Sequence, residues 1–252
     1  MNKDLLFETI FKRKSIRKYD MNSLSENELA EIVSHMKELK HMDDNIKIEM
    51  KLLTEKDVKG LLFAIKAPHY LVLYSEVKEG YLSNAGFVLQ QFDLFLSARG
   101  LGACWLGMTK PVKEFESKPG MEFVIVLAFG SATEALHRSD VSEFKRKGLK
   151  EITDITNYDE LLEPVRLAPS ATNSQPWYFT GGNGQINAYC IKLNPIKAFL
   201  YEKMNQIDMG IAICHLWIAA NHLGKRVDYI RPKAVQLDIP KGYSYHTTIG
   251  IS

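Results

Sequence analysis

A short basic stretch occurs twice in this chain, and the spacing of its copies constrains the fold more than any other feature. Phe11-Lys12-Arg13-Lys14 reappears letter for letter at 144–147. Two more matches follow in the same order: Glu28-Leu29 with Glu160-Leu161, and Ala98 and Leu101-Gly102 with Ala220 and Leu223-Gly224. Because the order is kept and the offsets are nearly constant, the sequence predicts an internal duplication. We expect two lobes, residues 1–142 and 143–252, that share one core.

The two halves also carry a similar order of predicted elements. In the first half, Ser25 and Glu28 form a capping box before an amphipathic helix, and an apolar helix at 84–99 lies between strands at 70–74 and 122–128. In the second half, Thr156 and Asp159 are expected to open a helix. A hairpin of WYFTG and INAYCIK, a buried helix at about 207–221 and a final strand YHTTIGI follow.

Composition narrows the class of protein. Hydrophobic residues make up 46% of the 252 residues and the formal net charge is +2, so neither nucleic acid nor a membrane surface is expected as the main partner. The three cysteines are widely spaced without a CxxC pair, and the histidines lack metal-ligand spacing, which argues against a disulfide framework or a metal site. No signal-peptide run is present. We expect a cytoplasmic protein.

Three segments carry candidate chemistry. The first, the basic stretch at residues 13–19 (RKSIRKY), surrounds a serine with cations. Arginine forks and a hydroxyl suit a phosphate group, although a solvated basic turn would have the same composition.

The other two segments are a polar loop and a glycine segment. The polar loop, residues 168–177 (APSATNSQPW), can present donors and acceptors to a heteroaromatic ligand, or can be an ordinary helix-to-strand connection. The glycine segment, residues 100–107 (GLGACWLG), lacks the spacing of a dinucleotide fingerprint or P-loop. We expect it to be a turn whose glycines allow a close backbone approach, either to a flat ligand or to a packed element. Within it, Cys104 is expected to be a small buried hydrophobe.

Together these segments resemble the nitroreductase family. Its members have an Arg-x-Ser-x-Arg-x-[Tyr/Phe] stretch, a Pro-Ser-[Ser/Ala]-x-Asn-x-Gln-Pro-Trp loop and a Gly-Leu-Gly-x-Cys-Trp turn, and all three occur here nearly to the letter. The close matches cover about forty residues. The resemblance implies an α+β fold, with a mostly antiparallel sheet flanked by helices and FMN held at a two-fold interface.

The resemblance also implies which residues bind FMN. Arg13, Ser15 and Arg17 would contact the phosphate and ribityl chain, with Lys14 close by. Backbone N–H groups around Gly107 and Met108 would lie near the flavin ring. From the other lobe, the residues implied to meet the ring are Pro169, Ser170, Ala171 and Asn173. The family adds a basic residue from a tail that corresponds here to 137–147, of which Arg146 is one candidate.

One departure from the family pattern is informative. Ordinary members carry the polar loop after their first helix and form two equal sites by dimerising, whereas here residues 37–43 (KELKHMD) stand in that place. The loop follows only the second amphipathic helix. The chain therefore resembles a fused pseudo-dimer, monomeric, with one complete site drawn from both halves.

The function implied is that of an FMN-dependent oxidoreductase. It would pass electrons from NADH or NADPH to a small oxidised acceptor, such as a nitroaromatic or a quinone, by a ping-pong mechanism. No side chain need act as a nucleophile, so no catalytic residue is assigned. Two alternatives stay open: a non-catalytic FMN-binding or sensing module, and another family activity such as free-flavin reduction.

Overall fold

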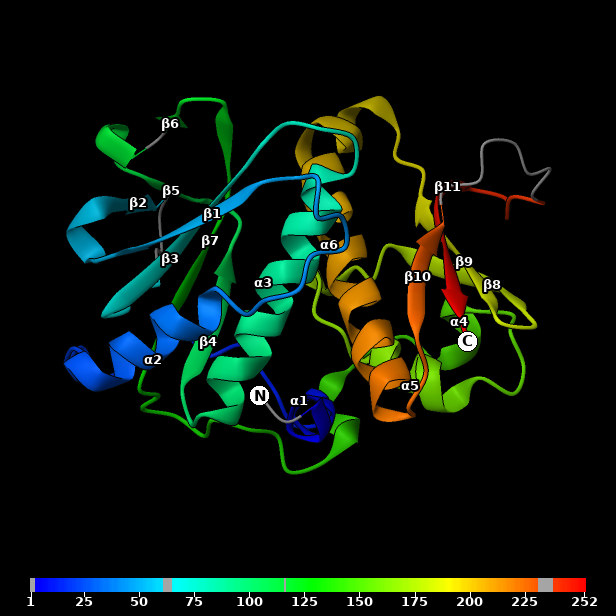
Figure 1. Cartoon of the computed structure of the whole chain (residues 1–252), viewed down its shortest axis with the longest axis horizontal. Coiled ribbons are helices and arrows are strands. Elements are labelled where there is room, and N and C mark those ends of the chain that lie inside the picture. Colours follow the sequence, from blue (N-terminus) through cyan, green and yellow to red (C-terminus); the bar gives the residue numbers. More distant parts are fainter. Residues whose placement is uncertain (1–2, 61–64, 116, 231–237) are drawn as a thin grey trace. The chain divides into compact units, whose positions relative to one another are not determined.

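The computed structural model describes residues 3–60, 65–115, 117–230 and 238–252. It divides into two compact units. The first unit is Lys12–Glu143, and the second unit combines Met1–Phe11 with Phe144–Ser252. Figure 1 labels their helices and strands.

The first unit is built on an antiparallel sheet against which a long buried helix packs. The sheet order is β1 (Ile48–Leu53), β3 (His69–Ser75), β7 (Met121–Gly130) and β4 (Gly102–Leu106), and β6 (Ser117–Lys118) also pairs with β7. The helix α3 (Tyr81–Ala98) contacts β3, β4 and β7. It is buried from Ser83 to Ser97, which explains why its sequence is apolar on nearly every face.

The remaining elements of the first unit are shorter. Helix α2 (Glu26–Met36) begins with the predicted capping box, in which Ser25 Oγ accepts from the Glu28 amide at 3.3 Å and Glu28 Oε2 accepts from the Ser25 amide at 2.9 Å. Strands β2 (Val58–Gly60) and β5 (Thr109–Pro111) form a separate two-stranded pair. The 3-10 turns are η1 (Glu55–Asp57), η2 (Lys113–Phe115) and η3 (Val141–Phe144). The last of these ends at Phe144, the first residue beyond the first unit.

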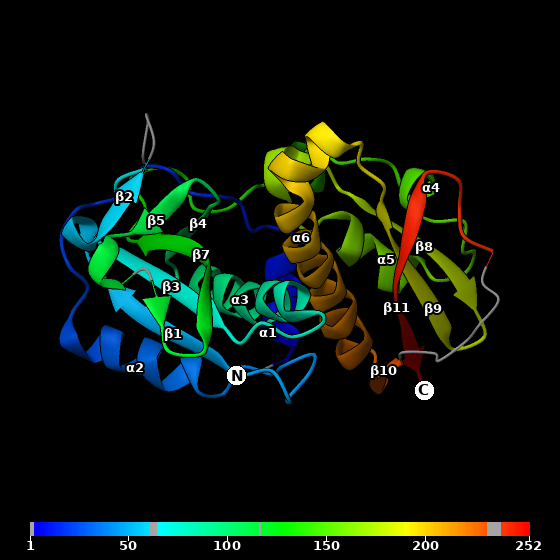
Figure 2. The ribbon, with the colours of Figure 1, turned by 90° about the horizontal axis from the view of Figure 1, so that it is seen from above.

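The second unit has a four-stranded antiparallel sheet and one long helix. The sheet order is β10 (Val227–Ile230), β11 (Tyr243–Ile251), β9 (Gln185–Ile191) and β8 (Trp177–Gly182). The long helix α6 (Pro195–His222) has 28 residues and contacts β9 and β10 (Figure 2). The remaining elements are α1 (Lys3–Ile10), α4 (Leu149–Ile152), α5 (Asp159–Arg166) and the 3-10 turn η4 (Ala171–Asn173); α1 and α5 pack against α6.

The main sheets of the two units repeat one topology. Each unit has a short helix (α2 or α5), two strands, a long helix (α3 or α6) and two more strands. The sheet orders, β1-β3-β7-β4 and β8-β9-β11-β10, are the same when the four strands of each path are numbered in chain order. This is the arrangement expected from a duplicated sequence, and the fused pseudo-dimer stays a prediction.

The N-terminal helix falls in a different unit from the one implied by lobes of 1–142 and 143–252. Helix α1 groups with the second unit because it packs on α6. The Phe7 ring stacks on the His222 ring with centroids 3.9 Å apart, and Asp4 Oδ1 lies 2.7 Å from His222 Nδ1.

Three element boundaries differ from the predicted ones. Helix α5 begins at Asp159 with Tyr158, not Thr156, at its N-cap position and without a side-chain cap, and Asn157 before it has a left-handed φ of 66°. Helix α6 begins at Pro195 rather than near residue 207, with Asn194 Oδ1 accepting from the Lys197 amide at 2.9 Å. The glycine segment is a turn only at its start, since residues 102–106 form β4.

Two kinds of feature are absent from the described residues. None of the helices there is both long and apolar enough to span a lipid bilayer. Within the same ranges, no group of three or more His, Cys, Asp or Glu side chains is placed to hold a metal ion.

Candidate functional site

The basic stretch lies along strand β4 in the first unit. The Ile16 amide donates to Ala103 O at 2.9 Å, and Ser15 pairs with Ala103 as a parallel bridge. Ile16 is fully buried against Gly102, where a Cβ atom would lie 2.7 Å from the Ile16 side chain. Gly102 is therefore needed for close packing beneath the basic stretch, which was one of the two roles considered for the glycine segment.

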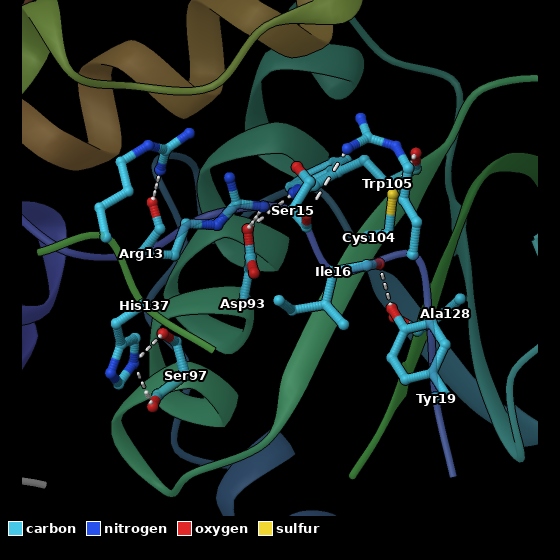
Figure 3. A network of polar contacts seen from close by, with 12 residues as sticks. Arg13, Ser15, Ile16, Tyr19, Asp93, Ser97, Cys104, Trp105, Ala128 and His137 are labelled. Carbon is cyan, nitrogen blue, oxygen red and sulfur yellow. Dashed lines mark hydrogen bonds and ion pairs between the residues drawn. The ribbon is translucent and has the colours of Figure 1, made fainter. Parts of the chain in front are cut away.

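Arg13 is buried and paired inside its own unit. Its Nη2 lies 2.6 Å from Asp93 Oδ2, and the same oxygen accepts from Trp105 Nε1 at 3.0 Å (Figure 3). Asp93 comes from the middle of α3. In the sequence Asp93 stood out only as a break in an apolar run, although a carboxylate on a buried helix is itself a signal of a buried partner.

The segment at 137–138 holds the other side of the basic stretch. Arg138 Nη1 donates to Arg13 O, and the Arg138 amide donates to Lys12 O at 2.8 Å. His137 Nε2 lies 3.0 Å from Ser97 Oγ (Figure 3), and burial lowers the pKa of His137. The stretch is thus fixed from both sides.

The remaining polar groups of the basic stretch suit an anion. Ser15 and Lys14 are half-buried, and Arg17 is exposed. The Arg17 amide donates to Glu134 Oε1 at 2.9 Å. Nη1 of the Arg17 guanidinium lies 3.5 Å from Ser15 O. Three cations (Lys14, Arg17 and the exposed Lys18) and a hydroxyl on one fixed stretch fit a phosphate group.

Gly107 and Met108 lie in the short connection between β4 and β5. Both are exposed, and 71% of the Met108 surface is accessible, an unusual fraction for a large apolar residue. These two residues therefore lie at the surface of the first unit, directly after β4, the strand along which the basic stretch lies.

The polar loop of the second unit has a strained, well-bonded backbone. Thr172, Asn173 and Gln175 have φ angles of 52°, 59° and 45°, in the left-handed region that non-glycine residues rarely adopt. The Gln175 amide donates to Ser170 Oγ at 2.9 Å, and Gln175 Nε2 donates to Arg166 O at 2.9 Å. Such strain persists where the surroundings enforce it and is common at functional sites.

The second basic copy, residues 144–147, folds onto the polar loop. Asn173 Nδ2 donates to Lys145 O at 3.0 Å, and Arg146 Nη1 donates to Asn173 Oδ1. Gln175 accepts from the Lys147 amide at 2.7 Å through Oε1 and from Lys147 Nζ at 2.8 Å through its backbone carbonyl. The amide side chains of the loop therefore have a structural role that was not predicted from the sequence.

The predicted site residues fall into two groups. Arg13, Lys14, Ser15 and Arg17 share one stretch of the first unit, which also holds Gly107 and Met108. Pro169, Ser170, Ala171, Asn173 and Arg146 belong to the second unit, where Arg146 contacts Asn173. Their joint role in one site stays a prediction.

A buried carboxyl beneath the polar loop was missed. Asp208 on α6 accepts from the Ala171 amide with both oxygens at 3.1 Å, and burial raises the pKa of Asp208 to about 8. The available signal was an aspartate within an apolar helical run.

Two other titratable groups are buried, and the burial of Cys104 confirms its prediction. Cys104 is buried, and burial raises the pKa of its thiol. His215 is a core residue whose Nδ1 lies 2.8 Å from Pro164 O.

Comparisons with known proteins point in the same direction. The family model described as "Putative TM nitroreductase" matches residues 5–220. No curated protein matches the chain. A solved structure described as a "putative nitroreductase" from Thermotoga maritima MSB8 is 20% identical, with a TM-score of 0.64, over 100% of this chain and 93% of that one. That likeness confirms the predicted α+β fold.

Two further solved structures cover less of this chain. An FMN-dependent nitroreductase from Clostridium difficile R20291 is 16% identical, with a TM-score of 0.45, over 59% of this chain and 97% of its own. A nitroreductase with bound FMN from Desulfitobacterium hafniense DCB-2 is 15% identical, with a TM-score of 0.43, over 54% and 92%. Because the family model spans most of the sequence and contains the basic stretch, the glycine segment and the polar loop, this chain belongs to the nitroreductase family that the model describes.

Proposed function

We propose that the chain is an FMN-dependent oxidoreductase that takes electrons from NADH or NADPH. The observation that carries the proposal is that one family model, over residues 5–220, includes all three candidate segments. The names of solved relatives support the cofactor, since one is called FMN-dependent and another contains FMN.

The proposal assigns phosphate binding to Ser15 and Arg17, with Lys14 beside them. These groups are accessible, as is Lys18 in the same stretch, whereas Arg13 is buried and paired with Asp93, which fixes the stretch in place. Charge-assisted hydrogen bonds of this kind are strong and specific for phosphate oxygens.

Ring binding is assigned to backbone and short side chains. In the second unit these are Pro169, Ser170, Ala171 and Asn173, and in the first unit the backbone at Gly107 and Met108. A rigid loop loses little conformational entropy when a flat ligand binds, which favours the strained polar loop for this role.

When bound, FMN would supply the redox chemistry, and the protein would bind it, orient it and exclude water. Donor and acceptor would use the same space in turn. The acceptor class that fits this scheme is a small oxidised molecule of the nitroaromatic or quinone type.

Steady-state oxidation of NADH and NADPH by the FMN-loaded protein tests the proposal. At several fixed concentrations of a quinone or nitroaromatic acceptor, we expect parallel double-reciprocal plots, because the two substrates would share one space. Intersecting lines would mean separate donor and acceptor sites. If the protein binds FMN but does not oxidise NADH or NADPH, it is a non-catalytic flavin-binding module and not an enzyme. If it does not bind FMN, the proposal is wrong as a whole.

A further inference from the structure

Asp208 on α6 has a buried carboxyl group that has no part in the FMN site as proposed above. Asp208 is 3% exposed, and it lies among buried neighbours on α6 from Ile207 to Leu216. Burying a carboxyl group without compensation is unfavourable. Its contact with the polar loop is symmetric, since both carboxyl oxygens lie 3.1 Å from the Ala171 amide nitrogen.

The polar loop that Asp208 contacts has a strained backbone. Thr172 and Asn173, directly after Ala171, both have left-handed φ angles, and Gln175 follows with a third. Each of these conformations costs free energy that the surroundings must offset. The Ala171 amide begins η4, so its acceptor fixes where the strained segment starts.

The other described anchors of the loop have different origins. The Ser170 hydroxyl bonds the loop to itself through the Gln175 amide, and Gln175 Nε2 bonds to the end of α5. Residues 145–147 bond to Asn173 and Gln175. The bond from the Ala171 amide to Asp208 ties the loop to α6, the most extensive buried element of the unit.

We propose that Asp208 is a positioning residue of the FMN site, whose carboxyl holds the Ala171 N–H group and, through it, the conformation in which the polar loop receives the flavin ring. This inference rests on the proposed FMN function and adds a residue to it. Asp208 does not itself touch the flavin.

The first test compares FMN affinities of the wild type, Asp208→Asn and Asp208→Ala by flavin fluorescence quenching. Asparagine keeps an oxygen acceptor at nearly the same place, so Asp208→Asn should bind FMN within about threefold of wild type. Alanine removes the acceptor, and Asp208→Ala should bind about five- to tenfold more weakly. Glu202→Ala, an exposed position on the same helix, is the control and should leave the affinity unchanged.

A second variant removes the other partner of the bond. Ala171→Pro deletes the N–H group at the first position of a short helix, where proline is well tolerated, and leaves α6 intact. It should weaken FMN binding to a similar extent as Asp208→Ala. The two changes together should cost no more than either alone, because they break the same hydrogen bond. If Asp208→Ala does not fold, Ala171→Pro is compared with Ala171→Gly, which changes the same ring-binding residue but keeps its N–H group and should therefore bind FMN more tightly than Ala171→Pro.

A third variant distinguishes positioning from general stability. Thr172→Gly relieves the left-handed strain, because glycine adopts that conformation readily. In the Asp208→Ala background it should recover a large part of the lost affinity. The positioning role would be overturned if Thr172→Gly and Asp208→Ala each weakened FMN binding and their losses of affinity added up in the double variant. It would also be overturned if Asp208→Ala bound FMN as tightly as the wild type.

Failure of the inference and failure of the proposed function give different results. If the wild type binds FMN and the Asp208 variants bind it equally well, only the positioning role falls. If the wild type does not bind FMN, the proposed function falls, and Asp208 cannot position a flavin site. In that case, the Ala171 amide resonance can be followed by NMR. If it shifts in Asp208→Ala but not in Asp208→Asn, Asp208 has a role in loop structure alone.

Discussion

At the scale of single residues, the charge of Arg13 is balanced inside its own unit. Asp93 lies 2.6 Å from the guanidinium, and Trp105 donates to the same carboxylate oxygen. The Asp93 carboxylate balances the charge of Arg13, while Arg13 Nε has no hydrogen-bond partner in the described part of the chain. Within the basic stretch, the groups accessible to an anion are the exposed Arg17 and Lys18 and the half-buried Lys14 and Ser15.

The Arg13–Asp93 pair should be costly to break. Asp93→Ala leaves a buried guanidinium without its carboxylate, and we expect a loss of about 3–5 kcal/mol in the free energy of unfolding. Glu31→Ala removes the exposed pair with Arg99 and should cost about 0–1 kcal/mol. Urea unfolding measures both. A double variant, Arg13→Met with Asp93→Leu, should regain most of the stability. Equal effects of Asp93→Ala and Glu31→Ala would contradict the buried-pair argument.

Arg17 should matter for cofactor affinity rather than for stability, because its side chain is exposed. Arg17→Ala should weaken FMN binding by ~1.5–3 kcal/mol, on the order of ten- to a hundredfold, through the loss of a charge-assisted bond to phosphate. The control is Arg226→Ala, whose guanidinium is exposed and lies 3.3 Å from Asp228 Oδ1. A flavin titration in which Arg17→Ala and wild type agree would remove Arg17 from the site.

At the scale of elements, local signals predicted most of the secondary structure. The capping box at Ser25 and Glu28 predicted the start of α2, and the short β-rich runs at 70–74 and 122–128 became β3 and β7. The hairpin of β8 and β9 was predicted from its turn residues. In each case the signal lies within a few residues of the element that it predicts.

The errors arose where distant residues decide the local structure. The first turns of α6 carry Ile196, Phe199 and Leu200 at helical spacing but are exposed. The helix was predicted only over its buried part, from about residue 207, instead of from Pro195. The Arg13–Asp93 pair joins residues far apart in the sequence, and the bonds from residues 145–147 to the polar loop depend on tertiary folding. Sequence spacing gives no measure of such contacts.

Asp208 couples the stability of the second unit to pH. Its pKa is about 8 in the folded protein and close to 3.8 without burial. Between these values the folded state keeps a proton that the unfolded state has lost, so stability falls as pH rises from about 4 to about 8. Asp208→Asn does not titrate. The unfolding free energy of wild type minus that of Asp208→Asn should therefore decrease with pH, by at most about 1.4 kcal/mol per unit. Urea unfolding at pH 5, 6, 7 and 8 measures the difference, and a constant value would contradict the raised pKa.

At the scale of the whole molecule, the two units repeat one topology but differ in the segment after their short helix. In the first unit, residues 37–43 are held by α3, with Asn84 Oδ1 accepting from the Met42 amide at 2.8 Å and Gln91 Oε1 from the Lys40 amide at 3.0 Å. In the second unit, Asp208 of α6 holds the polar loop. A long helix anchors this segment in both units, but the serine and asparagine suited to a flavin occur only in the second.

This asymmetry leads to a prediction about stoichiometry. One chain should bind one FMN, even at saturation, because residues 37–43 (KELKHMD) of the first unit, with Lys37 and His41, lack the Ser-x-x-Asn pattern of Ser170 and Asn173 in the polar loop. A strongly hydrated lysine and an imidazole cannot reproduce the compact donor and acceptor pattern of the loop. Asn173→Ala should therefore weaken FMN binding, whereas His41→Ala should leave it nearly unchanged. The decisive measurement is the ratio of released FMN to protein in a reconstituted sample whose mass is determined by light scattering. Two flavins per chain would refute the single-site model, and one flavin per two chains would replace it by a site that requires a second copy.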